Sequence, residues 1–425
     1  MSCIAGLERF VTKMLTPDGT LGLEGNHGIG KTTFVEVNMV RCIAEKHKVP
    51  LSRVHLISRC AGQIDPADLG GGFKTYKGRT YNCPPSWLPT SKKYDDKMRA
   101  IFGDEYQSDT IYEDYYILFI DEWKRGNPLI HNALMEITLS HKIFGVDLHE
   151  NTYIVVADND DLDIYNGNAN IDPAQMSRVE NHKYAPTNEE YLNIFKAKTD
   201  AGKMHPVVLE FLMTYPEYIV ISTETIRECA AKQQKTASPR DWEKLGWRLQ
   251  NAADNNFDYV ELQESDPVIS GELSDIATSI VGVHGAPFVT YCNDRKGMSV
   301  NLDTIIYGKV EAERKVELKK LEEIKKLSIP VIAYTGARKI AENKLKKPEH
   351  GAHLLELLQA LPNEGVAAFF YEWKAKDEKS AIDWMGYSGA RMNVIYKTLG
   401  GYKKWCETMK SRGIDINSDE PIDGD

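Results

Sequence analysis

Short apolar runs recur through the first half of the chain and alternate with amphipathic segments. Continuous apolar runs are typical of strands in a parallel sheet that helices cover on both faces. Apolar residues at helical spacing follow the first run, at Phe34, Val37 and Val40. This alternation predicts a three-layer α/β domain with a parallel sheet over residues 1–190. The predicted strands comprise residues 21–24, 53–57, 115–120, 153–157 and 179–184.

Two segments depart from this alternation. Residues 73–81 alternate aromatic and polar side chains around Lys77-Gly78, which predicts a β-hairpin with its turn at that pair. A second, smaller hairpin is predicted for residues 142–148, with its turn near Gly145. We therefore expect two hairpins in addition to the parallel sheet.

Beyond the α/β domain the pattern is mostly helical. We expect an α-helical lid over residues 191–290, then a mostly helical extension over 291–425 that ends in an acidic tail. The charged segment 308–328 predicts an amphipathic helix, whose charges form a solvated face or, less favoured, a nucleic-acid or coiled-coil surface. The aromatic residues 369–371 with Trp373 form a core or, less favoured, a docking surface. Further helices are predicted at residues 189–198, 207–214, 239–252, 352–361 and 365–374.

The composition is that of an ordinary globular protein of two or three domains, with 42% hydrophobic and 27% charged residues. A net charge of −10 gives no global basic footprint for nucleic acid. The seven cysteines are scattered without a C-x-x-C pair, which indicates a reducing compartment and argues against a zinc site. No apolar run approaches the ~18 residues of a membrane span, so we expect a soluble cytoplasmic protein with no membrane partner.

A phosphate-binding pattern, G-x-x-x-x-G-K-[ST], is matched without a mismatch between the first strand and its helix. Its glycines let backbone N–H groups point at a phosphate, and the helix that follows adds the positive end of its dipole. We expect Lys31 to reach the β- and γ-phosphates and Thr32 to bind Mg²⁺. The expected nucleotide is ATP; GTP is less favoured, since no guanine-reading N-K-x-D element lies beside the site. The expected nucleotide-binding residues are Gly25, Asn26, His27, Gly28, Ile29, Gly30, Lys31, Thr32 and Thr33.

Two acids, Asp121 and Glu122, end the strongly apolar strand 115–120. At the carboxyl end of a strand beside the phosphate loop, Asp121 would hold Mg²⁺ and Glu122 would polarise the attacking water. Without a phosphate loop nearby, an acid pair after a strand is more simply explained as the acidic first turn of a helix. With the phosphate loop in place, the pair predicts hydrolysis rather than binding alone. Asn159, at the tip of the next strand, either contacts the water or γ-phosphate or starts a turn.

Two arginines are further candidates. Arg178 precedes the last predicted strand and is either an arginine finger, which neutralises transition-state charge, or a surface residue. Arg240 follows Pro239 at the start of a predicted helix. It either faces the nucleotide from the lid or belongs only to the helix start.

Taken in order, these segments resemble the AAA+ ATPases and, within them, the MoxR-like group with a helix-2 insertion. The hairpins predicted at 72–83 and 142–148 lie where that group has its helix-2 insert and its pre-sensor-1 hairpin, both absent from ordinary P-loop proteins. The resemblance covers residues 5–290, and PPSWLP is similar to members found in bacteriophage genomes. The matching segments are GNHGIGKTT, LFIDE followed by WKRGNPLIHNALMEI, VVADN, IDPAQMSRV and SPRDWE.

The resemblance implies a homo-oligomeric ring, usually a hexamer, in which a neighbour completes each site and ATP hydrolysis remodels a protein client. A DNA-directed motor or helicase loader is an alternative, as is a nucleotide-gated scaffold with little turnover. Two residues depart from the family pattern: Lys124 stands where Asn is common, and Asp160 where Pro is common. By resemblance, Lys31 and Thr32 are Walker A, Asp121 and Glu122 Walker B, Asn159 sensor 1, Arg178 the trans-acting finger and Arg240 sensor 2.

Overall fold

The protein is described here by a computed structural model. The part of the chain that it describes comprises residues 3–64, 69, 71–125, 128–159, 177–263, 265–298, 300–323, 329–345 and 347–386. Asp160, most of the IDPAQMSRV segment and the acidic tail lie outside these residues. The chain divides into two compact units, and the domain boundaries predicted near residues 190 and 290 stay a prediction. The first unit comprises Met1–Ala197, Ile219–Lys244 and Ile280–Val283; the second comprises Lys198–Tyr218, Leu245–Ser279 and the chain from His284 onward.

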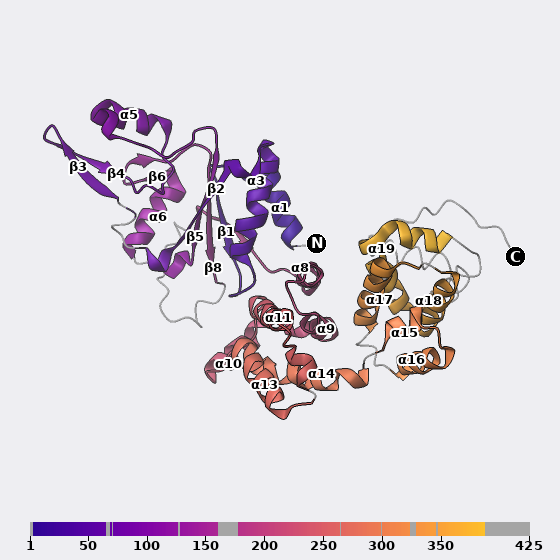
Figure 1. Cartoon of the computed structure of the whole chain (residues 1–425). Helices are drawn as coiled ribbons and strands as arrows, with labels where there is room; N and C mark the ends of the chain where they lie inside the picture. The colour runs from indigo at the N-terminus through magenta and orange to yellow at the C-terminus, as the bar shows by residue number, and fades with distance from the viewer. Residues whose placement is uncertain are drawn as a thin grey trace. The chain divides into compact units, whose positions relative to one another are not determined.

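A five-stranded parallel sheet with strand order β2-β5-β8-β1-β9 forms the centre of the first unit (Figure 1). The central strands are the most apolar ones, and all seven residues of β8 are buried, as expected for a sheet covered on both faces. The five predicted strands are therefore confirmed. Their bounds are β1 (Thr20–Glu24), β2 (Val54–Cys60), β5 (Tyr115–Asp121), β8 (Thr152–Asp158) and β9 (Glu180–Lys183).

The strand register brings three strand ends together. Glu24 of β1 pairs with Asp158 of β8, and β5 lies on the other side of β8. Because all five strands run the same way, the residues that follow β1, β5 and β8 meet at one edge of the sheet. The phosphate loop, the acids 121–122 and Asn159 lie at this edge.

Helices cover both faces of the sheet. On one face α6 packs its buried Ile130, Leu134 and Ile137 against residues of β5 and β8; α1 and α3 lie across the sheet from it (Figure 1). Before residue 188, helices α1, α5 and α6 were not predicted; α5 is capped by Ser91. The helices are α1 (Cys3–Lys13), α2 (Lys31–Thr33), a π-helical turn (Phe34–Met39), α3 (Val40–His47), α5 (Lys92–Phe102), α6 (Pro128–Ser140), α8 (Asn188–Asp200), α10 (Thr223–Ala231) and α11 (Pro239–Asp254), of which α8 and α11 continue into the second unit.

Both predicted hairpins are present. Lys77 and Gly78, between β3 (Gly72–Tyr76) and β4 (Arg79–Cys83), have φ angles of 47° and 74°. Positive φ at both central residues defines the tight turn that matches strand twist. The smaller hairpin pairs β6 (Lys142–Ile143) with β7 (Val146–Asp147).

The second unit is helical throughout its described part. Phe369, Phe370 and Trp373 are buried in the core that α15 to α19 share, so the core interpretation of these aromatics is confirmed. The helix predicted at 308–328 is present as α16, and Val316 on it is 56% exposed. Among the described residues, no helix has both the length and the apolar character that a membrane span requires. The bounds are α9 (Pro206–Thr214), α12 (Tyr259–Leu262), α13 (Pro267–Val281), α14 (Gly285–Met298), α15 (Leu302–Tyr307), α16 (Glu311–Glu323), α17 (Ile329–Asn343), α18 (Pro348–Ala360) and α19 (Asn363–Gly386).

The fold class predicted from the sequence is therefore confirmed. The chain has an α/β P-loop domain built on a parallel sheet, followed by helical segments and a mostly helical C-terminal region.

Candidate active site

The phosphate loop leaves β1 at Glu24 and ends where α2 begins at Lys31. Gly28 has a φ of 73°, and a Cβ placed there would lie 2.4 Å from the Ser238 Oγ. A side chain at this position is therefore excluded by the backbone conformation and by the close approach of the segment before α11. The second glycine of the pattern, Gly30, precedes the first helical residue.

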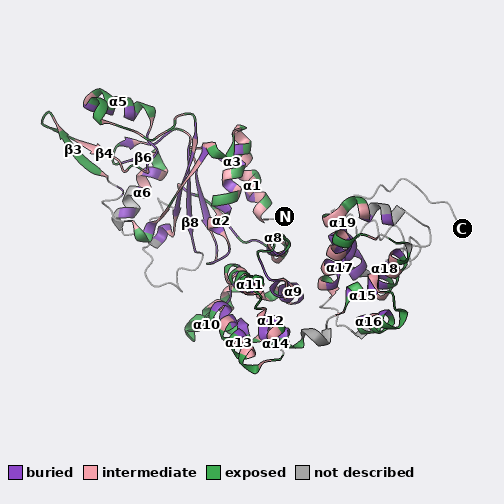
Figure 2. Ribbon diagram, viewed as in Figure 1, coloured by how far each residue is buried: buried purple, intermediate pink, exposed green. Residues whose placement is uncertain are grey.

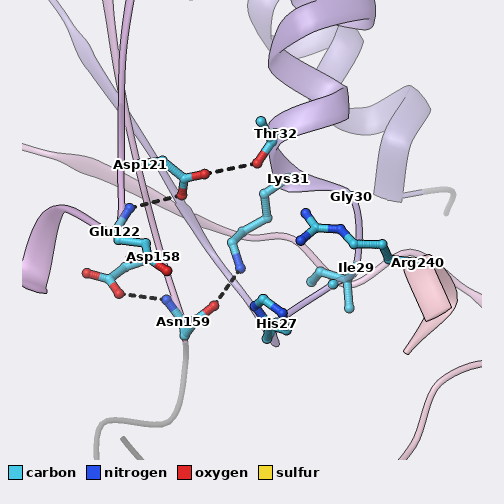
Figure 3. Close-up of a pocket in the computed structure, with 11 residues that line it drawn as sticks. His27, Ile29, Gly30, Lys31, Thr32, Asp121, Glu122, Asp158, Asn159 and Arg240 are labelled. Atoms are coloured by element: carbon cyan, nitrogen blue, oxygen red, sulfur yellow. Dashed lines mark hydrogen bonds between the residues drawn. The ribbon is translucent and has the colours of Figure 1, made fainter. Parts of the chain in front are cut away.

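A polar pocket lies against this loop and contains most of the predicted site residues (Figure 3). The acids come from the end of β5, Asn159 from the end of β8 and Arg240 from the start of α11. Of the predicted residues, Gly25, Asn26, Thr33 and Arg178 do not line it; Asn26 lines an adjoining pocket together with His27 and Asn159. The lining comprises His27, Gly28, Ile29, Gly30, Lys31, Thr32, Asp121, Glu122, Asp158, Asn159 and Arg240.

Lys31 is buried at the bottom of the pocket, and its ammonium group is held by oxygens. Its Nζ donates to the backbone carbonyls of Gly25 and Asn26 and, at 3.0 Å, to the Asn159 Oδ1. These bonds satisfy the donors of a cation that is only 7% exposed. A phosphate is an equally suitable acceptor for the same ammonium group.

The Thr32 hydroxyl donates to the Asp121 Oδ2 at 3.0 Å, while the Asp121 Oδ1 accepts from the Glu122 N–H. A hydroxyl and one carboxylate fit Mg²⁺, which is usually bound by one or two carboxylates together with substrate phosphates. Within the described part of the chain, no cluster of three His, Cys, Asp or Glu residues forms an all-protein metal site. The donor set therefore fits a metal that arrives with a nucleotide.

Glu122 has two unusual features. Its φ of 52° lies in the left-handed region, where a non-glycine residue is strained. Its Oε2 also accepts a hydrogen bond from the Cys60 Sγ at the end of β2, at 3.6 Å. Burial raises the pKa of Cys60, which keeps the thiol protonated and able to donate. No pattern in the sequence marks Cys60 as a site residue.

Asp158 is a buried acid of the site whose role was not predicted from the sequence. Its two oxygens accept from the backbone N–H groups of Asn159, at 2.7 Å, and of Lys124, at 2.6 Å. Burial raises the pKa of Asp158. The buried Lys124 in turn donates to the Glu24 Oε1 at 2.9 Å. One network therefore joins the ends of β1, β5 and β8.

Arg240 is held near the phosphate loop by its own backbone, whose N–H donates to the Gly28 carbonyl at 3.2 Å. Ser238 and Asp241 exchange hydrogen bonds at the start of α11 and fix its first turn. The pKa of His27 is lowered by desolvation first, then by the charges of Arg240 and Lys31, although part of the His27 side chain reaches solvent. His27 is therefore a neutral side chain beside two cations.

Arg178 lies elsewhere. It precedes β9, whose Glu180 pairs with Leu21 near the start of β1. Because the strands are parallel, Arg178 is at the sheet edge opposite to the phosphate loop. Its Nη1 is buried and finds no hydrogen-bond partner among the described residues.

Comparisons with known proteins find matches among solved structures. No protein-family model matches the sequence, and no curated protein matches it. Cdc6p from Pyrobaculum aerophilum superimposes with a TM-score of 0.36 at 12% identity, over 88% of this chain and 84% of the other. At this level of similarity no activity or residue role is transferred.

Two further solved structures show the range of these similarities. The Aeropyrum pernix ORC1 protein in complex with DNA has a TM-score of 0.34 at 14% identity, over 77% of this chain and 84% of the other. S. cerevisiae Hsp104 in complex with casein has a TM-score of 0.29 at 16% identity, over 69% of this chain and 48% of the other. The site's chemistry is therefore argued from its own geometry.

Proposed function

We propose that this chain hydrolyses ATP with Mg²⁺. One observation carries the proposal: the ends of three strands bring a loop lysine, a Thr–Asp pair and a second acid into one pocket at a helix N-terminus. Such a constellation supplies phosphate binding, a metal site and a general base together. The adjacent Glu122 favours hydrolysis over binding alone.

In the proposed reaction, Lys31 exchanges its carbonyl and Asn159 partners for β- and γ-phosphate oxygens. Thr32 and Asp121 would hold Mg²⁺, which would neutralise phosphate charge. Glu122 leaves the Cys60 thiol and accepts a proton from the water, whose oxygen bonds to the γ-phosphorus while the bond from that phosphorus to the ADP oxygen breaks. Arg240, beside the phosphate loop, stabilises charge on the transferred phosphoryl group.

We further propose that the chain is an AAA+ ATPase of the MoxR-like type that forms a ring and remodels a protein partner or complex. The order of the motifs and the two hairpins at the expected positions support this assignment. Arg178 supports it as well, because a residue at the opposite edge of the sheet is unable to serve its own pocket. It would complete the pocket of a neighbouring subunit. The expected ring is a hexamer in the cytoplasm.

The first experiment measures ATP hydrolysis per subunit as a function of protein concentration. A cooperative rise is expected, because each pocket would need Arg178 from a neighbour. Glu122→Gln is expected to lower turnover by about 10²-fold or more while nucleotide still binds. Glu150→Gln, which neutralises an exposed acid of the same unit, is the matched control and should leave turnover unchanged.

Other outcomes have distinct meanings. Activity that is high but independent of concentration would exclude a role for Arg178 in trans. Nucleotide binding without turnover, unchanged by Glu122→Gln, would replace the proposal by a nucleotide-gated scaffold. Faster turnover of GTP than of ATP would show that GTP, and not ATP, is the preferred substrate.

A further inference from the structure

The β3–β4 hairpin projects beyond the central sheet of the first unit and is exposed along most of its length (Figures 1 and 2). Cross-strand pairs place Phe73 opposite Asn82 and Thr75 opposite Thr80. Since alternate residues of a strand share a face, these four residues lie on one face, which we call the ribbon face. At its base Asn82 is half-buried, and its amide donates to the Phe144 carbonyl at 3.4 Å. Phe73 on this face is 78% exposed. Lys77 lies at its tip.

The other face of the hairpin is packed. The rings of Tyr76 and Tyr81 lie 5.4 and 5.3 Å from the ring of Phe102 on α5. Lys74, on the same face, pairs with Glu105 at 2.6 Å. These contacts fix the hairpin against α5 and leave the ribbon face turned outward. The exposure of Phe73 is therefore a consequence of a defined orientation of the hairpin.

The hairpin is basic although the whole chain has a net charge of −10. Residues 72–83 contain three basic side chains and no acidic one. Lys74 is neutralised by Glu105, but no ion pair is found for Lys77 or Arg79 in the part of the chain that the structure describes. Lys77 also holds a left-handed backbone, with φ of 47°, where Asn or Gly is preferred. Lys77 at the turn is therefore an exposed cation, and so is Arg79, which pairs with Tyr76 at the end of the packed face next to the tip.

We propose that the ribbon face and its basic tip bind single-stranded nucleic acid. An exposed aromatic ring stacks on an unpaired base, and this contact tolerates any base. Thr hydroxyls donate hydrogen bonds to phosphate or sugar oxygens, and the face carries the exposed Thr75 and Thr80. Lys77 and Arg79 supply the electrostatic attraction. A duplex keeps its bases stacked, so Phe73 favours a single strand.

The test measures binding of the full-length protein to a labelled oligo-dT of about 20 nucleotides, over a range of salt concentrations. Lys77→Glu/Arg79→Glu is expected to weaken binding at least tenfold. Loss of two phosphate contacts should also reduce the slope of log binding constant against log salt concentration by about 1.4 in magnitude. Lys309→Glu/Lys319→Glu makes the same change in net charge at two exposed lysines of the second unit and should retain wild-type binding.

Phe73→Ala is expected to weaken binding about fivefold or more. Val268→Ala, at another exposed apolar side chain, is its control and should have no effect. The proposal goes beyond ATP hydrolysis, because binding is measured without turnover. ATPase activity of each variant, measured in parallel, should equal that of the wild type and reports that the α/β domain is folded.

Four results would overturn the proposal. The first is no binding of oligo-dT by the wild type at moderate salt, and the second is equal binding by the hairpin variants and their controls. The third is binding of poly-glutamate as tight as that of oligo-dT, with the same dependence on Lys77 and Arg79, which would make the ribbon face a surface for an acidic protein segment. Equal or tighter binding of duplex DNA would remove the role given to Phe73.

Discussion

At the scale of single residues, the pocket combines groups whose charge states depend on one another. Lys31 and Arg240 are cations beside the loop, and both help to lower the pKa of His27 after the larger effect of desolvation. His27 is one of the variable positions of the phosphate-binding pattern, so the pattern alone gave no indication of its charge state. A bound triphosphate would reverse the electrostatic environment of this imidazole.

We predict that nucleotide binding takes up a proton at His27. In the free protein the pKa of His27 lies below its ordinary value of 6.5, and phosphate charges would raise it. Proton uptake should therefore grow as the pH falls from about 8 to about 6. Calorimetric titrations in buffers of different ionisation enthalpy measure it, and His27→Asn should abolish it. Uptake that persists in this variant would assign the proton to another group.

The same shift has a consequence for stability without nucleotide. The unfolded chain protonates His27 near 6.5, whereas the folded protein does so only at lower pH. Neutral His27 therefore contributes fully to the free energy of unfolding above pH 6.5. This contribution is lost as the pH falls from 6.5 toward the lower pKa of the folded state. Bound nucleotide should therefore raise the free energy of unfolding most strongly in this pH range below 6.5.

At the scale of elements, three strand ends are joined by the Asp158 carboxylate and by the pair of Lys124 with Glu24. Lys124 occupies a position where the family resemblance leads one to expect Asn, and the structure gives this lysine a specific partner. Because Glu24 directly precedes the phosphate loop, the pair connects that loop to the turn after Glu122.

We predict that Lys124 and Glu24 are energetically coupled. Lys124→Met and Glu24→Gln should each lower stability by about 1–3 kcal/mol, since each leaves a partner unsatisfied. A double-mutant cycle should give a coupling above about 1 kcal/mol. The exposed Arg338–Glu342 pair on α17 is the control, for which about 0.3–0.5 kcal/mol is expected. Additive effects at Lys124 and Glu24 would show that the pair is incidental.

A second prediction concerns the contact between α17 and α19. A Cβ on Gly336 would lie 2.5 Å from the Phe369 Cε2, inside a fully buried contact, whereas nothing lies within 4 Å of a Cβ on Gly271 in α13. Gly336→Ala should therefore destabilise the second unit by about 1–3 kcal/mol. Gly271→Ala should stabilise it by about 0.5–1 kcal/mol. Urea denaturation followed by circular dichroism measures both, and equal effects would contradict the packing argument.

At the scale of the whole molecule, Arg178 indicates how subunits would depend on one another. Arg178 lies at the sheet edge opposite to the loop, so under the proposed function it would contribute to the site of a neighbouring chain. We predict that Lys31→Ala and Arg178→Ala proteins are each inactive but regain about a quarter of the wild-type rate when mixed equally, since a quarter of random interfaces would be intact. A mixture as inactive as its components would exclude completion in trans.

The sequence predicted those parts of the site that are local in the chain. The phosphate loop is one continuous pattern, and Asp121, Glu122 and Asn159 each follow an apolar strand whose end lies beside it. Contacts between distant segments were not predictable: Cys60 and Glu122 are 62 residues apart, and Lys124 and Glu24 are 100 apart. Helix α5 was missed because its charged side chains dominate the sequence and only one narrow face is buried.

The ammonium group of Lys31 begins with a full set of oxygen partners, two of them from the loop itself. A ligand therefore enters by substitution, and its affinity is the difference between bonds formed and bonds given up. Any change that loosens the loop's hold on its own lysine would make the protein a better nucleotide trap and a slower releaser of product. In the proposed ATPase, the strength of these loop hydrogen bonds would therefore influence both nucleotide affinity and the rate of product release.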